Sequence, residues 1–116
     1  MKTLFILNDP PYGSERTYNG LRLAAALAAG EGNDVRVFLM GDAVLAGKTG
    51  QKVAEGFYNI QLMLNRIAKH AAQIGICGTC MDARGIAVAE LSEGAHRGSL
   101  DELAHWTQWA DKVLVY

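Results

Sequence analysis

Residues 73–80 read Gln-Ile-Gly-Ile-Cys-Gly-Thr-Cys, a short apolar run that ends in the two cysteines of the chain. The run does not alternate cleanly between apolar and polar residues, which is typical of a parallel strand covered on both faces. Three other segments share this character: Lys2 to Leu7, Asp34 to Met40 and Lys112 to Tyr116. The sequence therefore predicts four buried strands, with a Cys-x-x-Cys segment directly after the third.

Helical patterns lie between these strands, in the segments Arg16 to Ala29, Tyr58 to Ala72 and Ser99 to Ala110. The last of them opens with Ser-Leu-Asp-Glu, the pattern of a capping box. The segment Arg84 to Leu91 is undecided between a short helix, a loop and a strand. Alternating strands and helices predict an α/β fold with a parallel sheet and right-handed crossovers, built as a single domain over residues 1–116.

The composition limits the classes of protein to which the chain can belong. Half of the residues are hydrophobic, a fifth are charged and the net charge is −1, so we expect a globular protein without a basic nucleic-acid footprint. The apolar surplus predicts burial between subunits. The N-terminal apolar run is too short for a signal peptide or a membrane helix, and we expect a cytoplasmic protein without a membrane partner.

Cys77 and Cys80 are the leading candidates for chemistry. A thiol between a strand and a helix lies near the positive end of the helix dipole, which favours the thiolate. Cys77, at the strand exit, is the expected nucleophile, and Cys80 is expected to resolve a mixed disulfide or to accept sulfur. Two buried, inert cysteines are the alternative, but Gly78 and Thr79 argue against a packed strand interior. No histidine spacing completes a zinc site, so we expect neither a metal nor a cofactor.

Two loops at the carboxyl ends of the predicted strands are expected to shape access to these thiols. Gly41 to Thr49 resembles a phosphate-binding loop, but it has five residues between its glycines where the pattern needs four. We interpret it as a flexible loop over the site, with Lys48 supplying positive charge. The loop after the first strand lacks the hydroxyl-rich pattern of a flavin site, and its Pro11, Tyr12 and Gly13 form a shaped turn.

Charged residues also flank the cysteines. Arg84 is expected to stabilise a thiolate or a sulfur anion, whereas Asp82 is expected either to pair with Arg84 or to face solvent.

The chain resembles the DsrE/DsrF-like family, and most of all its small YchN-like branch. The resemblance runs over nearly the whole length. It is carried by Pro10 to Glu15, Leu21 to Ala24, Val37 to Met40, Asp42 to Val44, Gly50 to Lys52, Gly56, Tyr58 to Gln61, Cys77 to Ile86 and Ala110 to Leu114.

This resemblance implies a three-layer, flavodoxin-like (DsrE-like) parallel sheet with helices on both faces. It also implies a homo-oligomer, typically a hexamer built as a dimer of trimers. Sulfur-relay members carry a persulfide on a cysteine that precedes an Arg-Gly pair by seven residues, a position that Cys77 holds ahead of Arg84 and Gly85. Cys80 belongs to the YchN-like pattern and not to relay proteins generally.

Three functions follow as hypotheses. The first is a sulfur carrier or sulfurtransferase-like protein, in which Cys77 holds a persulfide between a donor and an acceptor protein, with Cys80 and Arg84 assisting. The second is a dithiol redox protein or sensor, and the third is a non-enzymatic oligomeric binding module. The residues expected to line the site are Pro11, Tyr12, Gly13, Lys48, Gly78 and Thr79.

Overall fold

A five-stranded, all-parallel sheet forms the centre of the computed structural model, which describes residues 1–116. The strands are β1 (Lys2–Leu7), β2 (Asp34–Leu39), β3 (Gln73–Cys77), β4 (Ala95–Gly98) and β5 (Lys112–Val115). Their order across the sheet is β4-β3-β2-β1-β5. The four strands predicted from the sequence are all present, and the α/β fold with a parallel sheet is confirmed.

Strand β4 was not predicted from the sequence. Its residues, Ala-His-Arg-Gly, form no apolar run, because an edge strand needs only one paired neighbour and its side chains are half-buried or exposed. It pairs with β3 in parallel register, from Ile74 opposite Ala95 to Cys77 opposite Gly98. The undecided segment Arg84 to Leu91 consists of a turn and a short 3₁₀ helix, Val88–Glu90.

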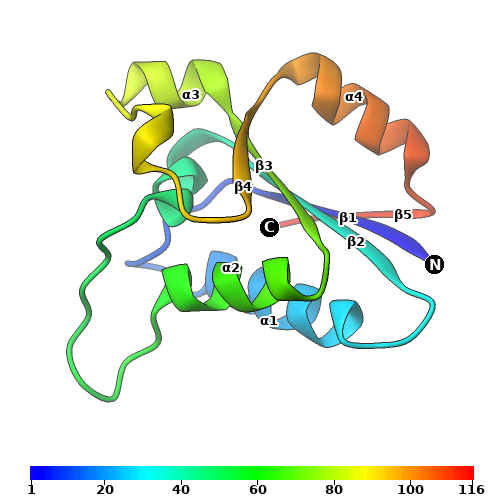
Figure 1. Ribbon diagram of the computed structural model, residues 1–116, viewed down its shortest axis with the longest axis horizontal. Helices are drawn as coiled ribbons and strands as arrows, with labels where there is room; N and C mark the ends of the chain where they lie inside the picture. Colours follow the sequence, from blue (N-terminus) through cyan, green and yellow to red (C-terminus); the bar gives the residue numbers. More distant parts are fainter.

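Helices cover the two faces of the sheet unequally (Figure 1). The helices α1 (Arg16–Ala28) and α2 (Ile60–Lys69) pack side by side on one face. Helix α4 (Leu100–Trp109) crosses the other face on its way from β4 to β5. The short helix α3 (Gly78–Ala83) follows directly from β3 and stands at the carboxyl end of that strand.

The core reflects this unequal cover. Eighteen buried residues form one cluster that includes the α1 and α2 side of the sheet, whereas only Leu4, Phe38, Leu103 and Trp106 form the cluster under α4. Val115 lies opposite Ile6 in the register of β1 and β5 and remains 63% exposed. An apolar part of the α4 face of the sheet therefore stays open to solvent.

The segment after β2 does not have the structure that we expected from the sequence. Instead of a flexible loop, residues Gly41–Gly47 form a 3₁₀ helix in which Ala43, Val44 and Ala46 are fully buried. Gly47 packs so tightly that a Cβ there would overlap the side chain of Ile76. The apolar residues between the two glycines thus serve packing, which is the physical reason that the segment does not form a mobile cover.

No helix of the structure combines the length and the apolar character that crossing a membrane requires.

The start of α4 depends on Ser99, whose Oγ accepts a hydrogen bond from the backbone N–H of Glu102 at 3.2 Å. The Glu102 carboxylate contacts His96 Nε2 at 2.8 Å, so it does not complete the expected capping box. We predict that Ser99→Ala lowers the free energy of unfolding by about 1 kcal/mol in urea denaturation, because it removes the cap. Ser99→Asn keeps an acceptor and should retain nearly all of the stability. Equal losses in both variants would contradict this assignment.

Candidate functional site

Cys77 is the last residue of β3 and the N-cap of α3. Its backbone is not helical, with φ −54° and ψ 115°, and its Sγ accepts a hydrogen bond from the backbone N–H of Cys80 at 3.3 Å. A sulfur atom here occupies the place that a serine or aspartate oxygen usually takes at a helix start. The cap thus keeps the Cys77 sulfur at the carboxyl end of the sheet, where ligands gather in open parallel α/β folds.

Hydrogen bonds to the sulfur favour its ionised form. Burial, the largest single influence on this thiol, opposes ionisation, but hydrogen bonds from the Cys80 thiol, from the Thr79 hydroxyl and from the backbone outweigh it and lower the pKa of Cys77. The Thr79 hydroxyl oxygen lies 3.4 Å from the Cys77 sulfur. The thiolate fraction of Cys77 therefore exceeds that of an ordinary cysteine at neutral pH.

Cys80 behaves in the opposite way. Burial, followed by donation of its own thiol hydrogen to Cys77, raises the pKa of Cys80, although the backbone N–H of Gly41 and the charge of Arg84 act against this rise. The Gly41 N–H donates to the Cys80 sulfur at 3.3 Å. Both cysteines are free thiols. The pair thus consists of one thiol that ionises readily and one that tends to keep its proton.

Arg84 lies on the Cys80 side of the pair. Its guanidinium donates to Asp42 Oδ1 at 2.9 Å and to the carbonyl oxygen of Cys80 at 3.1 Å. These contacts connect the end of α3 to the 3₁₀ helix Gly41–Gly47. Arg84 is therefore near the site, as expected, but its hydrogen bonds go to a carboxylate and a carbonyl.

Arg97 is a cation beside the end of β3 that carries Cys77, and sequence reasoning missed it. It lies on β4 opposite Ile76, next to the pair of Cys77 and Gly98. Hydrogen bonds to Asp82, and in addition the negative charge of the Cys77 thiolate, raise the pKa of Arg97. No local sequence signal pointed to Arg97, because its position depends on a strand that has no apolar pattern.

Asp82 and Gly78 together allow the Arg97 guanidinium to lie against α3. Asp82 accepts two hydrogen bonds from Arg97, at 2.8 and 2.9 Å. It therefore does not pair with Arg84, and solvent is not its sole partner. A Cβ built on Gly78 would lie only 2.7 Å from the guanidinium carbon of Arg97. The missing side chain at Gly78 gives the guanidinium the room to approach the first turn of α3.

Lys48 points to a different partner. Its ammonium nitrogen lies 3.4 Å from a carboxylate oxygen of Glu90, in a half-exposed ion pair. Lys48 thus contacts the segment that precedes β4. Its expected role, supplying positive charge beside a thiolate, stays untested.

The first loop is anchored by Tyr12. The Tyr12 hydroxyl donates to Gln51 at 2.6 Å and accepts the backbone N–H of Ile60 at 3.1 Å. Pro11 is buried, and Gly13 has a φ of 98°, a left-handed backbone that favours glycine. An apolar cavity of about 360 Å³ borders this loop and is lined by Tyr12, Val53, Ala54, Phe57 and Tyr58.

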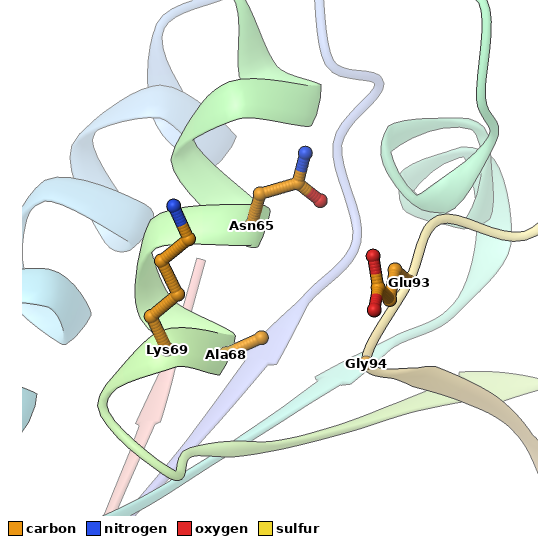
Figure 2. A pocket seen from close by; sticks show the side chains of 5 residues that line it. All are labelled: Asn65, Ala68, Lys69, Glu93 and Gly94. Atoms are coloured by element: carbon orange, nitrogen blue, oxygen red, sulfur yellow. The ribbon is translucent and has the colours of Figure 1, made fainter.

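A second and larger cavity lies away from the thiols. It measures about 420 Å³ and lies between α2 and the approach to β4, lined by Asn65, Ala68, Lys69, Glu93 and Gly94 (Figure 2). Neither cavity is lined by a cysteine. The thiol pair thus lies at a strand end outside both of these cavities, and both cysteines are half-buried.

No group of three or more histidine, cysteine, aspartate or glutamate side chains comes together in a way that could hold a metal ion.

The fold and the thiol site define the class of protein. The model of the DsrE/DsrF-like family matches residues 1–116, and the chain belongs to this family. It is 50% identical to protein YchN of Escherichia coli K12 over 116 residues, which cover 99% of this chain and 98% of that protein. It is 33% identical, over 96% of its length and 90% of the relative, to an uncharacterized protein of Methanopyrus kandleri.

Solved structures agree with this assignment. The crystal structure of YchN from E. coli superposes with a TM-score of 0.93 at 49% identity, covering 99% of this chain and 98% of that one. A protein of unknown function from Methanobacterium thermoautotrophicum shares the fold with a TM-score of 0.75 at 11% identity, over 99% of this chain and 98% of that one. The DsrE-like architecture expected from the resemblance is thus confirmed.

The Thr79 hydroxyl is one of the groups that lower the pKa of Cys77, so its removal has a predictable sign. We predict that Thr79→Val moves the midpoint of the pH profile for Cys77 alkylation to higher pH and slows alkylation at pH 7 about two- to fivefold, since less thiolate is present. Thr79→Ser keeps the hydroxyl and should retain the wild-type midpoint. The measurement is iodoacetamide labelling from pH 5 to 10 with peptide mapping. An unchanged midpoint in Thr79→Val would show that this hydrogen bond does not matter for ionisation.

Proposed function

We propose that this protein is a sulfur carrier in which Cys77 holds a sulfane sulfur as a persulfide. The observation that carries the proposal is the inequality of the two thiols: the backbone N–H of Cys80 and the Thr79 hydroxyl lie within hydrogen-bond distance of Cys77 Sγ and help to lower the pKa of Cys77, whereas burial raises the pKa of Cys80. A persulfide carrier needs one nucleophilic thiolate that outside partners can reach. Membership of a family that includes sulfur-relay proteins supports the same function.

Loading is a displacement at sulfur in which electrons balance without an added oxidant. The Cys77 thiolate attacks the sulfane sulfur of a donor persulfide, R–S–SH. A new S–S bond forms to Cys77 while the donor S–S bond breaks, and the donor leaves as a thiolate, R–S⁻, with the electron pair. The product is Cys77–S–SH, which ionises readily. A donor protein or small persulfide and an acceptor thiol complete the cycle as partners.

Unloading has two routes. An acceptor thiolate can attack the terminal sulfur and take it as a new persulfide, leaving the Cys77 thiolate. Alternatively, Cys80, once deprotonated, attacks the Cys77 sulfur and releases HS⁻, which leaves a Cys77–Cys80 disulfide that an external dithiol must reduce. Loading of Cys77 and the route through Cys80 both need free thiols, and we propose the cytoplasm, a reducing compartment, as the place of action.

A dithiol redox protein is the second candidate function. The backbone N–H of Cys80, which donates to Cys77 Sγ at 3.3 Å, favours it, because this contact keeps the Cys77 sulfur beside the turn of α3 that carries Cys80. In that function the pair cycles between dithiol and disulfide, and no sulfur atom is transferred. A non-enzymatic binding module needs neither reaction.

We also propose that copies of this chain associate through the open part of the α4 face of the sheet. The exposed Val115 lies beside Ile6 there, and Met40 packs at the margin of the small cluster under α4. Exposed apolar surface of this kind is costly in water and is covered in oligomers. The resemblance implies a hexamer built as a dimer of trimers.

The carrier function predicts a mass change. After incubation with a cysteine desulfurase and cysteine, we expect one added sulfur atom on Cys77, detected by intact mass and peptide mapping and removed by dithiothreitol. Cys77→Ser should gain no sulfur while keeping its fold. Cys80→Ser should still be loaded, because the nucleophile is intact, and should hold its persulfide at least as long as the wild-type protein.

Other outcomes separate the three candidates. A loss of two hydrogens with Cys77 linked to Cys80, and never an added sulfur, would replace the carrier by the dithiol function. Complete inertness of both thiols toward donor and mild oxidant would leave the binding module. Sulfur uptake by Cys77→Ser at the wild-type level would refute Cys77 as the carrier.

The association surface has its own prediction. We expect Val115→Lys to lower the oligomer mass measured by light scattering, because an ammonium group in an apolar contact is costly to desolvate. Leu62→Lys is the matched control: Leu62 is 60% exposed, close to the 63% of Val115, but lies on α2. An oligomer that survives Val115→Lys and dissociates with Leu62→Lys would place the contact on the opposite face.

A further inference from the structure

Arg97 and Asp82 form an exposed ion pair beside the reactive thiol. The side chains are 40% and 63% exposed, although two hydrogen bonds of 2.8 and 2.9 Å join them. Pairs this exposed contribute little to the stability of a fold, because water screens both charges. A contribution to stability is therefore a weak reason for the arrangement.

The guanidinium has donors left over for a ligand. Arginine carries five N–H donors in a planar fork, and Asp82 uses one on each terminal nitrogen. The guanidinium Nε lies 2.7 Å from the point where a Gly78 Cβ would be, which places the guanidinium beside the first residue of α3. The negative charge of the Cys77 thiolate acts on this group as well. A guanidinium with N–H groups left over thus lies next to Gly78, the residue that follows Cys77 in the chain.

We propose that Arg97 is the anion-binding residue of this site and makes Cys77 selective for electrophiles and sulfur donors that carry a negative charge. This inference rests on the carrier function for its biological substrate, a small anionic sulfane-sulfur donor or an acidic donor segment. Asp82 is the resident counter-ion, which shares Arg97 with the incoming anion. Gly78 keeps the path between the two groups open.

The charge balance of the loading step explains why a cation helps. Before attack, the negative charges are on the Cys77 thiolate and on the anionic group of the donor; afterwards they are on the departing thiolate and on that same anionic group, while Cys77 carries the neutral persulfide Cys77–S–SH. Arg97 stays beside both sites of negative charge without accepting or donating a proton. It also offsets the repulsion between a thiolate and an anionic donor, which would otherwise slow their encounter.

The test compares two alkylating reagents that differ only in charge. Iodoacetate is anionic and iodoacetamide is neutral, and both attack the same sulfur. The ratio of their rate constants at Cys77 cancels the thiolate fraction and the accessibility of the thiol, so it reports the local charge. We expect Arg97→Met to lower this ratio about fivefold at low ionic strength, and the difference to shrink in 1 M salt.

Two variants keep the result interpretable. Arg97→Lys retains the positive charge and should retain most of the preference for iodoacetate. Arg22→Met removes one positive charge from α1, where Arg22 stacks on Tyr18, and should leave the ratio unchanged. If Arg97→Met keeps the wild-type ratio, or if Arg22→Met lowers it equally, Arg97 is not the anion-binding residue.

The same samples separate this inference from the carrier function. Wild-type protein that gains no sulfur but prefers iodoacetate through Arg97 would refute the carrier and keep the anion site. Wild-type protein that gains sulfur, with equal reagent ratios in the wild type and Arg97→Met, would keep the carrier and refute the anion site.

Discussion

The parallel pairing of β3 with β4 is the constraint on which the site depends. Because Cys77 lies opposite Gly98 and Ile76 opposite Arg97, the edge strand places a guanidinium beside the residue where β3 ends. A Cβ at Gly78 would lie 2.7 Å from the guanidinium, so a side chain there would force the guanidinium to move from this position. A shift of β4 by one residue would turn Arg97 to the other face of the sheet.

The two cysteines share one motif but have different surroundings. Cys77 collects donors from the Cys80 thiol, the Thr79 hydroxyl and the first turn of α3, all of which favour its anion. Cys80 is held by the backbone N–H of Gly41 at the start of the 3₁₀ helix and has Arg84 on its carbonyl side. An arginine thus lies near each cysteine, Arg97 near Cys77 and Arg84 near Cys80. Each of these arginines forms an ion pair with an aspartate on a neighbouring element.

The unequal cover of the sheet connects the fold to the proposed association. Two helices and a large cluster bury one face, while a cluster of only four residues, two of them on α4, lies on the other. Arg36 and Trp109 reinforce the attachment of α4, with the guanidinium 3.8 Å from the ring centre. On this face Val115, near the carboxyl end of β5, remains 63% exposed, and the carboxyl ends of the parallel strands form the end of the sheet that carries Cys77.

The sequence alone determined the α/β class, the four apolar strands, the three longer helices and the position of Cys77 at a strand exit, because these follow from local periodicity and from a motif continuous in the chain. Tertiary structure decided what local patterns do not encode. β4 owes its strand conformation to hydrogen bonds with β3, so its short polar sequence gave no signal. The segment Gly41–Gly47 forms a packed 3₁₀ helix because apolar side chains of this segment are buried in the core. The partners of Asp82, Arg84 and Lys48, and the presence of Arg97, depend on contacts between residues far apart in sequence.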